Sequence, residues 1–333
     1  MQSASWNPNK LPAALSAPGR VALFGCLLAG VLWSGVSSAQ SRAVALTFDD
    51  LPAVGRVVPP GGHALSMRDT RSFNRTILSA LRRHRAPAIG FVNEAGVVAD
   101  SPAEARAVLR QWLKDGHELG NHTFGHVDLS AMPPDEFEKQ IIDGEDSIRP
   151  LMLGAGKPLR YLRFPFNHSG ATLEAHSAIQ HFLAEHGYQT ATCTIDTEDY
   201  LFDGAYSVAL DRRDRKTAGR LRAEYLKYTS AEIDYYTQLH QQVFGHEIPH
   251  VMLLHVNRLN AAVMPEILRI FEQKGFRFVT LAEAQSDPAY QTADTFATKF
   301  GPMWGYRWAR VLGIQVNGRL EPEPPAWIGQ YGK

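Results

Sequence analysis

The apolar residues of this chain follow two different periods from residue 43 onward. Short apolar or β-branched runs, typical of buried strands, alternate with longer segments whose apolar positions recur at helical spacing. The predicted strands are "AVALTF" (43–48), "AIGFVN" (88–93), "HELGNH" (117–122), "YLRFPF" (161–166), "QTATCTI" (189–195), "HVMLLHV" (250–256) and "RFVTL" (277–281). The predicted helices lie near 72–84, 103–114, 135–148, 172–186, 205–245 and 261–274. This alternation predicts an α/β fold with a parallel sheet, either closed as a barrel or open and doubly wound.

Two segments fall outside this repeating pattern. The connection from Asp199 to about Pro249 is far longer than the usual link between a strand and a helix, and its apolar residues recur at roughly helical spacing. We therefore expect an inserted helical lobe over about 203–248, before the sixth strand. Residues 288–333 are rich in aromatic residues and proline. We expect a C-terminal extension there, which either packs its aromatic rings on the outside of the fold or forms a sugar-stacking or lid surface.

Residues 1–39 have the pattern of a signal peptide. Lys10 and Arg20 precede the apolar run "VALFGCLLAGVLWSGV", and the small residues Ser37 and Ala39 predict cleavage after Ala39. The alternative is an uncleaved membrane anchor, although the run is shorter than the ~20 apolar residues of a spanning helix. We expect an exported protein, periplasmic or extracellular, that meets the membrane only during export.

Composition and charge narrow the class of protein. The 333 residues, of which 44% are hydrophobic, can bury a large core, and we expect one domain over residues 40–287 rather than two small ones. Lys plus Arg equals Asp plus Glu at 34 each, so we expect no nucleic-acid partner. Cleavage would remove Cys26 and leave Cys193 without a disulfide partner, as a small core residue. Nothing in the sequence specifies an oligomeric state.

Polar side chains that could bind a ligand or take part in a reaction lie where the predicted strands end. In strand order they are Asp49 and Asp50, His122 and His126, Arg163, Asp199 and Tyr200, and His255. Parallel α/β folds bind their ligands at the carboxyl ends of the strands. We therefore expect these residues to meet at one mouth of the fold.

Two histidines and a carboxylate in this set indicate a metal site. His122 and His126 are four residues apart, so a turn brings them to one side. With one carboxylate they supply three ligands and leave a position open, as in catalytic zinc sites. Of the adjacent Asp49 and Asp50, one can hold the cation while the other accepts a proton from water. Taken alone, the histidine pair also fits solvated or core histidines, and the aspartate pair also fits a helix cap or a turn.

Three further residues can set the proton affinities of the acid and the base: Arg163, Asp199 and His255. A guanidinium beside the basic carboxylate would lower the proton affinity of that carboxylate and fix its rotamer. His255 beside Asp199 would stay protonated more readily, because a nearby negative charge favours the imidazolium, and it could then act as a general acid.

Together these motifs resemble those of the polysaccharide deacetylases of carbohydrate esterase family four. The five ordered motifs of that family appear as "TFDD", "HTFGH", "RFPF", "DTEDY" and "LLH", between about residues 42 and 285. The resemblance implies a distorted (β/α)7–8 barrel. It also implies metal-dependent hydrolysis of N- or O-acetyl groups on a carbohydrate, either an oligosaccharide or a bacterial envelope glycan. Zn²⁺ is the default ion for this donor set, and Co²⁺, Ni²⁺ and Mn²⁺ also fit it.

The resemblance also assigns a role to each matching residue. It implies that Asp49 is the base, that His255 is the acid, and that Arg163 and Asp199 orient Asp49 and His255 respectively. It implies that the metal ligands are Asp50, His122 and His126. It places the backbone N–H of Phe166 at the oxyanion and the side chains of Leu253 and Tyr200 around the acetyl methyl group. Phe166 and Tyr200 depart from the usual tyrosine and tryptophan of the family.

Two alternative functions remain at this stage. Another metal-dependent amidase or esterase, or a phosphoester hydrolase, could use the same three ligands on a similar barrel. A non-catalytic glycan-binding protein could keep the fold, although the presence of Asp49 and His255 argues against it.

Overall fold

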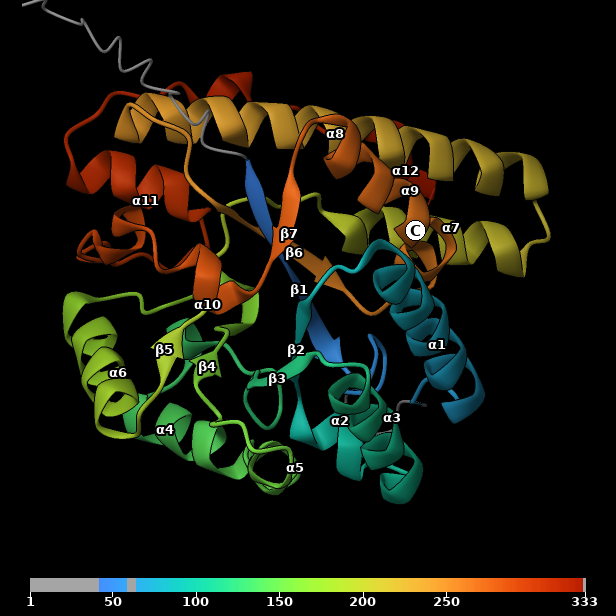
Figure 1. Cartoon of the computed structure of the whole chain (residues 1–333), viewed down its shortest axis with the longest axis horizontal. Helices are drawn as coiled ribbons and strands as arrows, with labels where there is room; N and C mark the ends of the chain where they lie inside the picture. The colour runs from blue at the N-terminus through green and yellow to red at the C-terminus, as the bar shows by residue number, and fades with distance from the viewer. Residues whose placement is uncertain (1–41, 59–63, 332–333) are drawn as a thin grey trace, which may run out of the picture. The chain divides into compact units, whose positions relative to one another are not determined.

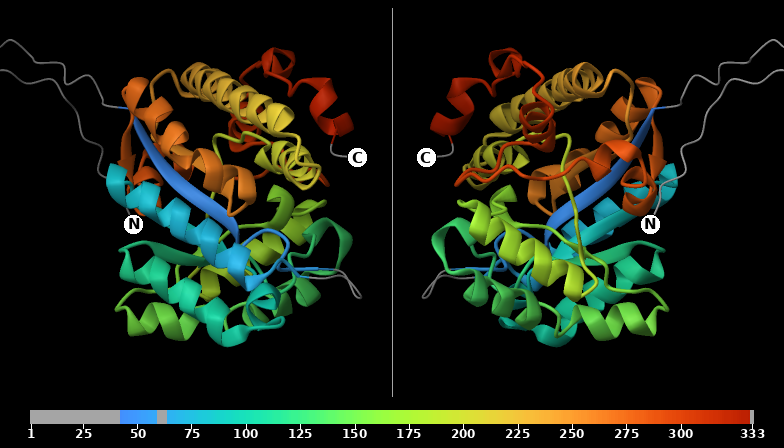
Figure 2. Two further views of the ribbon diagram at one scale, coloured as in Figure 1. Left: turned by 90° about the vertical axis from the view of Figure 1, so that its right-hand side faces the viewer. Right: turned by 90° about the vertical axis from the view of Figure 1, so that its left-hand side faces the viewer.

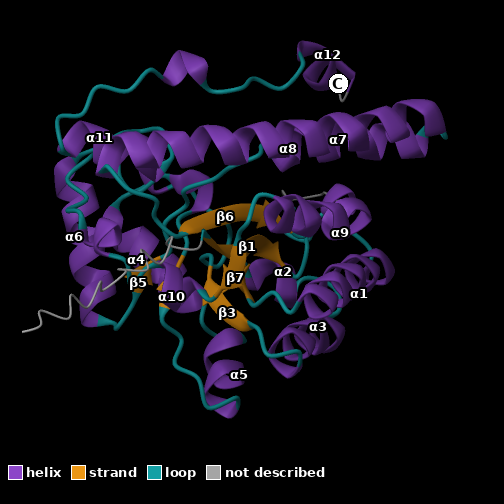
Figure 3. Cartoon of the chain, turned by 45° about the horizontal axis from the view of Figure 1, so that its top comes forward, coloured by secondary structure: helices purple, strands orange, loops and turns teal. Residues whose placement is uncertain are grey.

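A curled sheet of parallel strands forms the centre of the fold, with helices around it (Figures 1 and 3). The computed structural model describes residues 42–58 and 64–331, so the predicted signal peptide lies outside the described residues. The strands are β1 (Ala43–Leu51), β2 (Ala88–Val92), β3 (Glu118–Asn121), β4 (Tyr161–Leu162), β5 (Gln189–Thr190), β6 (His250–His255) and β7 (Arg277–Val279). Their order is β5-β4-β3-β2-β1-β6, and β7 pairs with the first residues of β1.

The two edges of this sheet meet in the segment that follows β5. Ile195 forms a parallel bridge with Met252 of β6. The backbone N–H of Leu253 donates to the carbonyl of Ile195 at 2.9 Å, and that of Thr194 donates to the carbonyl of Val251 at 2.9 Å. These bonds join β5 to β6 through an irregular segment. The predicted fold class, a distorted parallel barrel, is confirmed.

Amphipathic helices cover the outside of the sheet. They are α1 (Met67–His84), α2 (Glu94–Val98), α3 (Pro102–Lys114), α4 (Pro134–Asp143), α5 (Ile148–Gly154), α6 (Leu173–Glu185), α7 (Asp199–Asp211), α8 (Arg215–Phe244), α9 (Arg258–Gln273), α10 (Leu281–Ala284), α11 (Trp304–Val311) and α12 (Ala326–Tyr331). Local side chains set where several of them begin. The Ser66 hydroxyl accepts from the N–H of Asp69 at the start of α1, and the Asn257 side chain accepts from the N–H of Asn260 at the start of α9. No helix of the described residues is both long and apolar enough to cross a membrane.

The inserted lobe consists of the two helices α7 and α8. Figure 1 shows α8 running along one side of the sheet, with α7 beside it. The lobe begins at Asp199, four residues before the predicted start at 203. Asp199 and Tyr200 therefore lie in the first turn of a helix, and this turn directs them toward the end of the barrel.

The structure corrects three predicted elements. The predicted helix at 135–148 ends at Asp143, and a second helix begins at Ile148. Residue 144 between them must be glycine, because a Cβ there would lie 2.7 Å from Oδ1 of Asn121 and 2.9 Å from the carbonyl carbon of Thr123. The predicted strands at 161–166 and 189–195 shrink to two residues each. After β4 the chain turns at Pro165, and after β5 only the bridge at Ile195 continues the strand direction.

The C-terminal extension packs against the inserted lobe. Trp304 and Trp308 of α11 are each only 2% exposed. The Trp308 ring lies 5.3 Å from the ring of Phe244 at the end of α8, and 5.3 Å from that of Tyr290. Figure 2 shows the C-terminal helices (red) beside α8 (yellow) in both views. The extension therefore belongs to the outer helical layer.

The hydrophobic core lies between the sheet and these helices. Phe48 of β1 is fully buried, and its ring meets that of Trp112 of α3 edge-on at 5.5 Å. Cys193 is also fully buried, and burial raises the pKa of its thiol, so the predicted core role of this cysteine is confirmed.

We expect Phe48→Ala to lower the free energy of unfolding by about 3–5 kcal/mol, because the substitution leaves a cavity under α3. Phe300→Ala is the matched control, since the Phe300 side chain is 64% exposed. Its effect should stay within about 0.5 kcal/mol. Urea unfolding of both variants measures the difference. If both variants lost the same free energy of unfolding, the Phe48–Trp112 contact would not contribute to the stability of the core.

Candidate active site

The parallel register brings the predicted site residues to one end of the barrel. Asp49 at the end of β1 pairs directly with His255 at the end of β6. Eight of the ten predicted residues line a cavity of about 570 Å³: Asp49, Asp50, His122, His126, Phe166, Tyr200, Leu253 and His255. The other two, Arg163 and Asp199, are buried behind Asp49 and His255 and contact them directly.

Asp50, His122 and His126 form a group that fits a divalent cation. Their ligand atoms lie within 4.8 Å of one another, and no other such group of three is present in the described residues. Oδ1 of Asp50 is 3.7 Å from Nε2 of His122 and 3.6 Å from Nε2 of His126. These distances are too long for hydrogen bonds, and Asp50 Oδ1 is buried with no hydrogen-bond partner. A cation between these atoms would satisfy all three groups.

Neighbouring backbone fixes the orientation of His122. Its N–H donates to the carbonyl of Val92 at 3.0 Å, and its Nδ1 donates to the carbonyl of Arg163 at 2.8 Å. The second bond sets the tautomer and leaves the Nε2 lone pair facing Asp50. Burial lowers the pKa of His122 well below its ordinary value, which keeps the imidazole neutral, the form that binds metal.

The backbone of this end of the barrel is strained. Six of the eight non-glycine residues with positive φ in the described residues lie at or beside the cavity: Asp50, Thr123, His126, Phe166, Asn167 and Glu198. Asp, His and Asn tolerate this left-handed region better than most residues, whereas Thr and Phe rarely adopt it. A hydrogen bond holds Thr123 in this conformation: its backbone N–H donates to the side chain of Asn121 at 2.8 Å.

Arg163 orients Asp49 from below. The guanidinium is fully buried and makes contacts in three directions. Nη1 lies 3.4 Å from Oδ2 of Asp49, Nη2 donates to the Thr47 hydroxyl at 3.0 Å, and Nε donates to the carbonyl of Ala191 at 2.9 Å. The Phe91 ring lies 4.9 Å from the guanidinium carbon. This geometry fixes the carboxylate and leaves Oδ1 of Asp49 without a partner.

Burial sets the proton affinity of Asp49. It raises the pKa of this carboxyl to about 6, and the positive charges of Arg163 and His255 oppose the shift. Arg163 lowers the pKa of Asp49, as predicted, but burial raises it by more, so the net shift is upward. A carboxylate with a pKa near neutrality can accept a proton from an attacking water.

Asp199 and His255 form a second buried pair. Nδ1 of His255 donates to Oδ1 of Asp199 at 2.6 Å, and the backbone N–H of His255 donates to Oδ2 at 2.8 Å. Nδ2 of Asn260 also donates to Oδ2. Burial opposes both charges, but their mutual attraction outweighs it. The pKa of Asp199 is lowered, and that of His255 is raised to about 10. His255 is therefore protonated at neutral pH and can donate a proton.

Phe166, Tyr200 and Leu253 surround the mouth of the cavity. The side chains of Phe166 and Tyr200 are 55% and 60% exposed, whereas Leu253 is buried at the cavity wall. The Phe166 ring meets the His126 ring edge-on at 4.5 Å. Two exposed aromatic rings beside a polar centre are suited to stacking on a flat apolar face of a ligand.

Sequence reasoning missed several residues that line the cavity. Asn167, Asp196 and Glu198 lie within or next to the quoted motifs, so their position at strand ends was the available signal. Burial and the nearby Asp196 raise the pKa of Glu198 to about 7. Gly301 also lines the cavity, and no motif marks it, because it belongs to the C-terminal extension.

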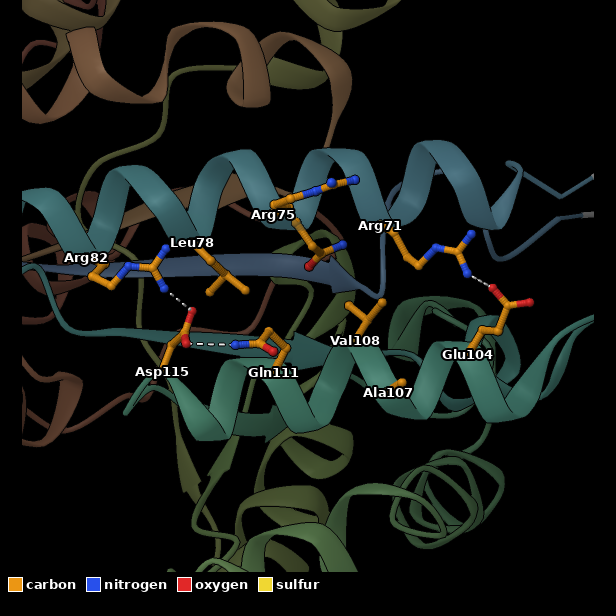
Figure 4. Close-up of a pocket in the computed structure, with 10 residues that line it drawn as sticks. Arg71, Arg75, Leu78, Arg82, Glu104, Ala107, Val108, Gln111 and Asp115 are labelled. Atoms are coloured by element: carbon orange, nitrogen blue, oxygen red, sulfur yellow. Dashed lines mark hydrogen bonds and ion pairs between the residues drawn. The ribbon is translucent and has the colours of Figure 1, made fainter.

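A separate cavity of about 340 Å³ lies between α1 and α3 (Figure 4). Arg71 forms an ion pair with Glu104, and Arg82 pairs with Asp115 at 3.3 Å. This cavity shares no lining residue with the candidate site. Its ion pairs tie the two helices together.

Comparison with known proteins supports the family expected from the motifs. The family model described as polysaccharide deacetylase matches residues 37–191, a stretch that contains Asp49, Asp50, His122, His126 and Arg163. Residues 37–191 thus match the polysaccharide deacetylase family. The resemblance expected from the five motifs is confirmed.

Curated proteins that are similar to this chain are named as deacetylases. A chitooligosaccharide deacetylase of Sinorhizobium fredii is 31% identical over 130 residues, which cover 39% of this chain and 49% of that protein. A peptidoglycan-N-acetylglucosamine deacetylase of Bacillus cereus is 26% identical over 157 residues, covering 47% of this chain and 46% of that protein. The chain thus spans about half the length of these two relatives.

Solved structures of carbohydrate esterase family four also match the chain. One is a mutant of a pseudoenzyme from Bacillus anthracis with restored enzymatic activity. It matches with a TM-score of 0.48 and 16% identity, covering 74% of this chain and 68% of that one.

We expect Asp50→Ala and His126→Ala to weaken Zn²⁺ binding by more than about 100-fold, since even changes outside the ligand set cost about 10- to 100-fold. His181→Ala is the matched control, because that histidine is 76% exposed on α6. Elemental analysis and titration against a chelating dye measure occupancy and affinity. Full occupancy in both site variants would show that the ligand set is wrong.

Proposed function

We propose that this protein is a metal-dependent deacetylase that hydrolyses acetyl groups on a glycan. One observation carries the proposal: the register of β1 and β6 places Asp49 opposite His255, beside the group of Asp50, His122 and His126. A carboxylate able to take up a proton and an imidazolium able to release one thus line the same cavity. The match to the family supports the choice of acetyl groups.

Asp50, His122 and His126 are the residues that would hold the ion. A divalent cation there would supply Lewis acidity, which makes a water more acidic and polarises an acetyl carbonyl oxygen. Two imidazoles and one carboxylate favour Zn²⁺, and Co²⁺, Ni²⁺ and Mn²⁺ are the alternatives.

The residues of the chain divide the proton transfers between them. Asp49 accepts a proton from the attacking water, and Arg163 holds the carboxylate in place for that step. His255 gives its proton to the departing sugar nitrogen or oxygen, while Asp199 keeps the imidazole charged and oriented. The Phe166 backbone N–H is our candidate for stabilising the oxyanion. Attack by water needs no covalent intermediate with the protein.

The substrate we propose is an N-acetylated oligosaccharide or bacterial envelope glycan. The cavity is open, and the exposed Phe166 and Tyr200 rings offer stacking surfaces for sugar rings. The curated relatives act on chitooligosaccharide and peptidoglycan according to their names. We further propose that the protein works outside the cytoplasm after cleavage behind Ala39, where such a glycan is accessible.

We expect Asp49→Asn to abolish acetate release while leaving metal content unchanged, because the amide cannot accept the proton. Acetate release by the chain from residue 40 onward should be assayed on chitooligosaccharides, peptidoglycan and acetylated xylan, with and without chelator. Chelator should remove the activity, and added Zn²⁺ should restore it. Release of phosphate or ammonia in place of acetate would favour another hydrolase of this fold.

We expect Asp199→Asn to move the alkaline limb of kcat/KM to lower pH. The carboxylate of Asp199 raises the pKa of His255, so in the wild type the acid form persists as the pH rises toward about 10. Without that charge, burial alone acts and lowers the pKa, so the proton is lost at lower pH. A pH profile of kcat/KM for both proteins measures the shift. An unchanged alkaline limb would remove His255 from the role of acid.

A further inference from the structure

The C-terminal extension reaches the loop that carries Phe166. This segment, the Phe166 loop, comprises residues 164–170, and its residues Phe166 and Asn167 line the catalytic cavity. Both have positive φ, 58° and 56°. Two consecutive non-glycine residues in this conformation need support from surrounding structure. The contacts that surround the loop show where that support comes from.

Arg307 of α11 makes the principal contacts. Its side chain is only 1% exposed, and its Nη2 donates to the carbonyl of Asn167 at 2.5 Å. Its Nη1 donates to the Ser169 hydroxyl at 2.6 Å, and its Nε donates to the carbonyl of Pro302 at 2.8 Å. The guanidinium also lies over the Trp304 ring at 4.1 Å. One buried side chain therefore links the extension to two residues of the Phe166 loop.

Gly301 lies in close contact with the same loop at the cavity wall. A Cβ at this position would lie 1.9 Å from the carbonyl oxygen of Phe166 and 3.0 Å from Cβ of Asn167. Glycine is therefore required for the extension to approach the loop this closely. Gly301 also lines the catalytic cavity, so the extension forms part of its wall.

Asn167 receives a third set of contacts. Its Nδ2 lies 3.9 Å from the sulfur of Met303, and its Oδ1 accepts from the thiol of Cys193 at 3.4 Å. The backbone N–H of Trp304 donates to the carbonyl of Cys193 at 3.2 Å. The extension is thus bonded both to the Phe166 loop and to the segment after β5.

We propose that Arg307 is a positioning residue for the deacetylation reaction. It holds the Phe166 loop in the left-handed conformation that sets the Phe166 backbone and ring at the cavity. Gly301 sets how closely the extension can approach. This inference rests on the proposed function. Residue 307 lies outside the region that the family model matches, residues 37–191, so the family motifs do not assign it.

The test compares Arg307→Gln and Gly301→Ala with wild type and with Arg310→Gln in the chain from residue 40 onward. Arg310 is the matched control, because it is an exposed arginine on the same helix that lies over the Phe296 ring. Arg307→Gln removes the bonds to the loop, whereas Gly301→Ala displaces the loop and leaves Arg307 in place.

We expect kcat for acetate release to fall by about 10- to 100-fold in both variants, with metal content unchanged and a smaller change in KM. Hydrogen exchange of the amides in residues 164–170 should accelerate in both variants and not in Arg310→Gln. A purely structural role of Arg307 would lower the unfolding temperature and leave kcat per folded, metal-loaded molecule unchanged. That result in both variants would overturn the proposal.

The two proposals fail in different ways. If the wild type releases no acetate from any substrate, the proposed function is wrong, and the exchange measurement still tests whether the extension holds the loop. If the wild type is active, unchanged kcat in Arg307→Gln and Gly301→Ala refutes the positioning role alone. Unchanged exchange in both variants refutes it whatever the activity.

Discussion

The buried guanidinium of Arg163 is the interaction on which the site depends. A charge in this position needs an anionic partner, because leaving it unpaired in the protein interior is strongly unfavourable. Asp49 is that partner, and it is also the carboxylate that we assign as the base. The carbonyl of the same arginine accepts the bond that orients His122. Arg163, at the end of β4, therefore aligns Asp49 on β1 and His122 after β3. The stability of the barrel and the geometry of the site are linked through this residue.

Much of the site could be predicted because its residues sit at strand ends. A hydrophobic run followed by a polar residue is visible in the sequence, and parallel strands bring such ends together. This reasoning predicted a parallel α/β fold, a metal site made of His122, His126 and one of two aspartates, and the pairing of Asp199 with His255. The choice of a barrel and of Asp50 as the third ligand came from the resemblance to the family. The long connection before β6 likewise indicated its helices. In each case the signal lay within a few residues of the group concerned.

The rest depended on contacts that leave no local signal. Asn121 and Thr123 lie against Gly144, where α4 ends, although the helical pattern of the sequence continues past that point. The proton affinity of Asp49 follows from burial, which depends on the whole barrel. The contact between Arg307 and Asn167 joins residues 140 positions apart. Nothing in the sequence around either residue marks this contact.

The left-handed residues around the cavity have a consequence for engineering. Each such residue costs roughly 1–3 kcal/mol relative to a relaxed backbone, and the surrounding packing must hold it in place. Replacing Phe166 or Asn167 with glycine would relieve this backbone strain, and it would also allow the loop to adopt other conformations. Variants selected only for heat resistance would tend to accumulate such glycine substitutions at the mouth of the barrel. A more stable protein obtained in that way would lose the cavity geometry on which the proposed reaction depends. Stabilising substitutions are therefore better sought in the helices that face away from the cavity, such as α1 and α3.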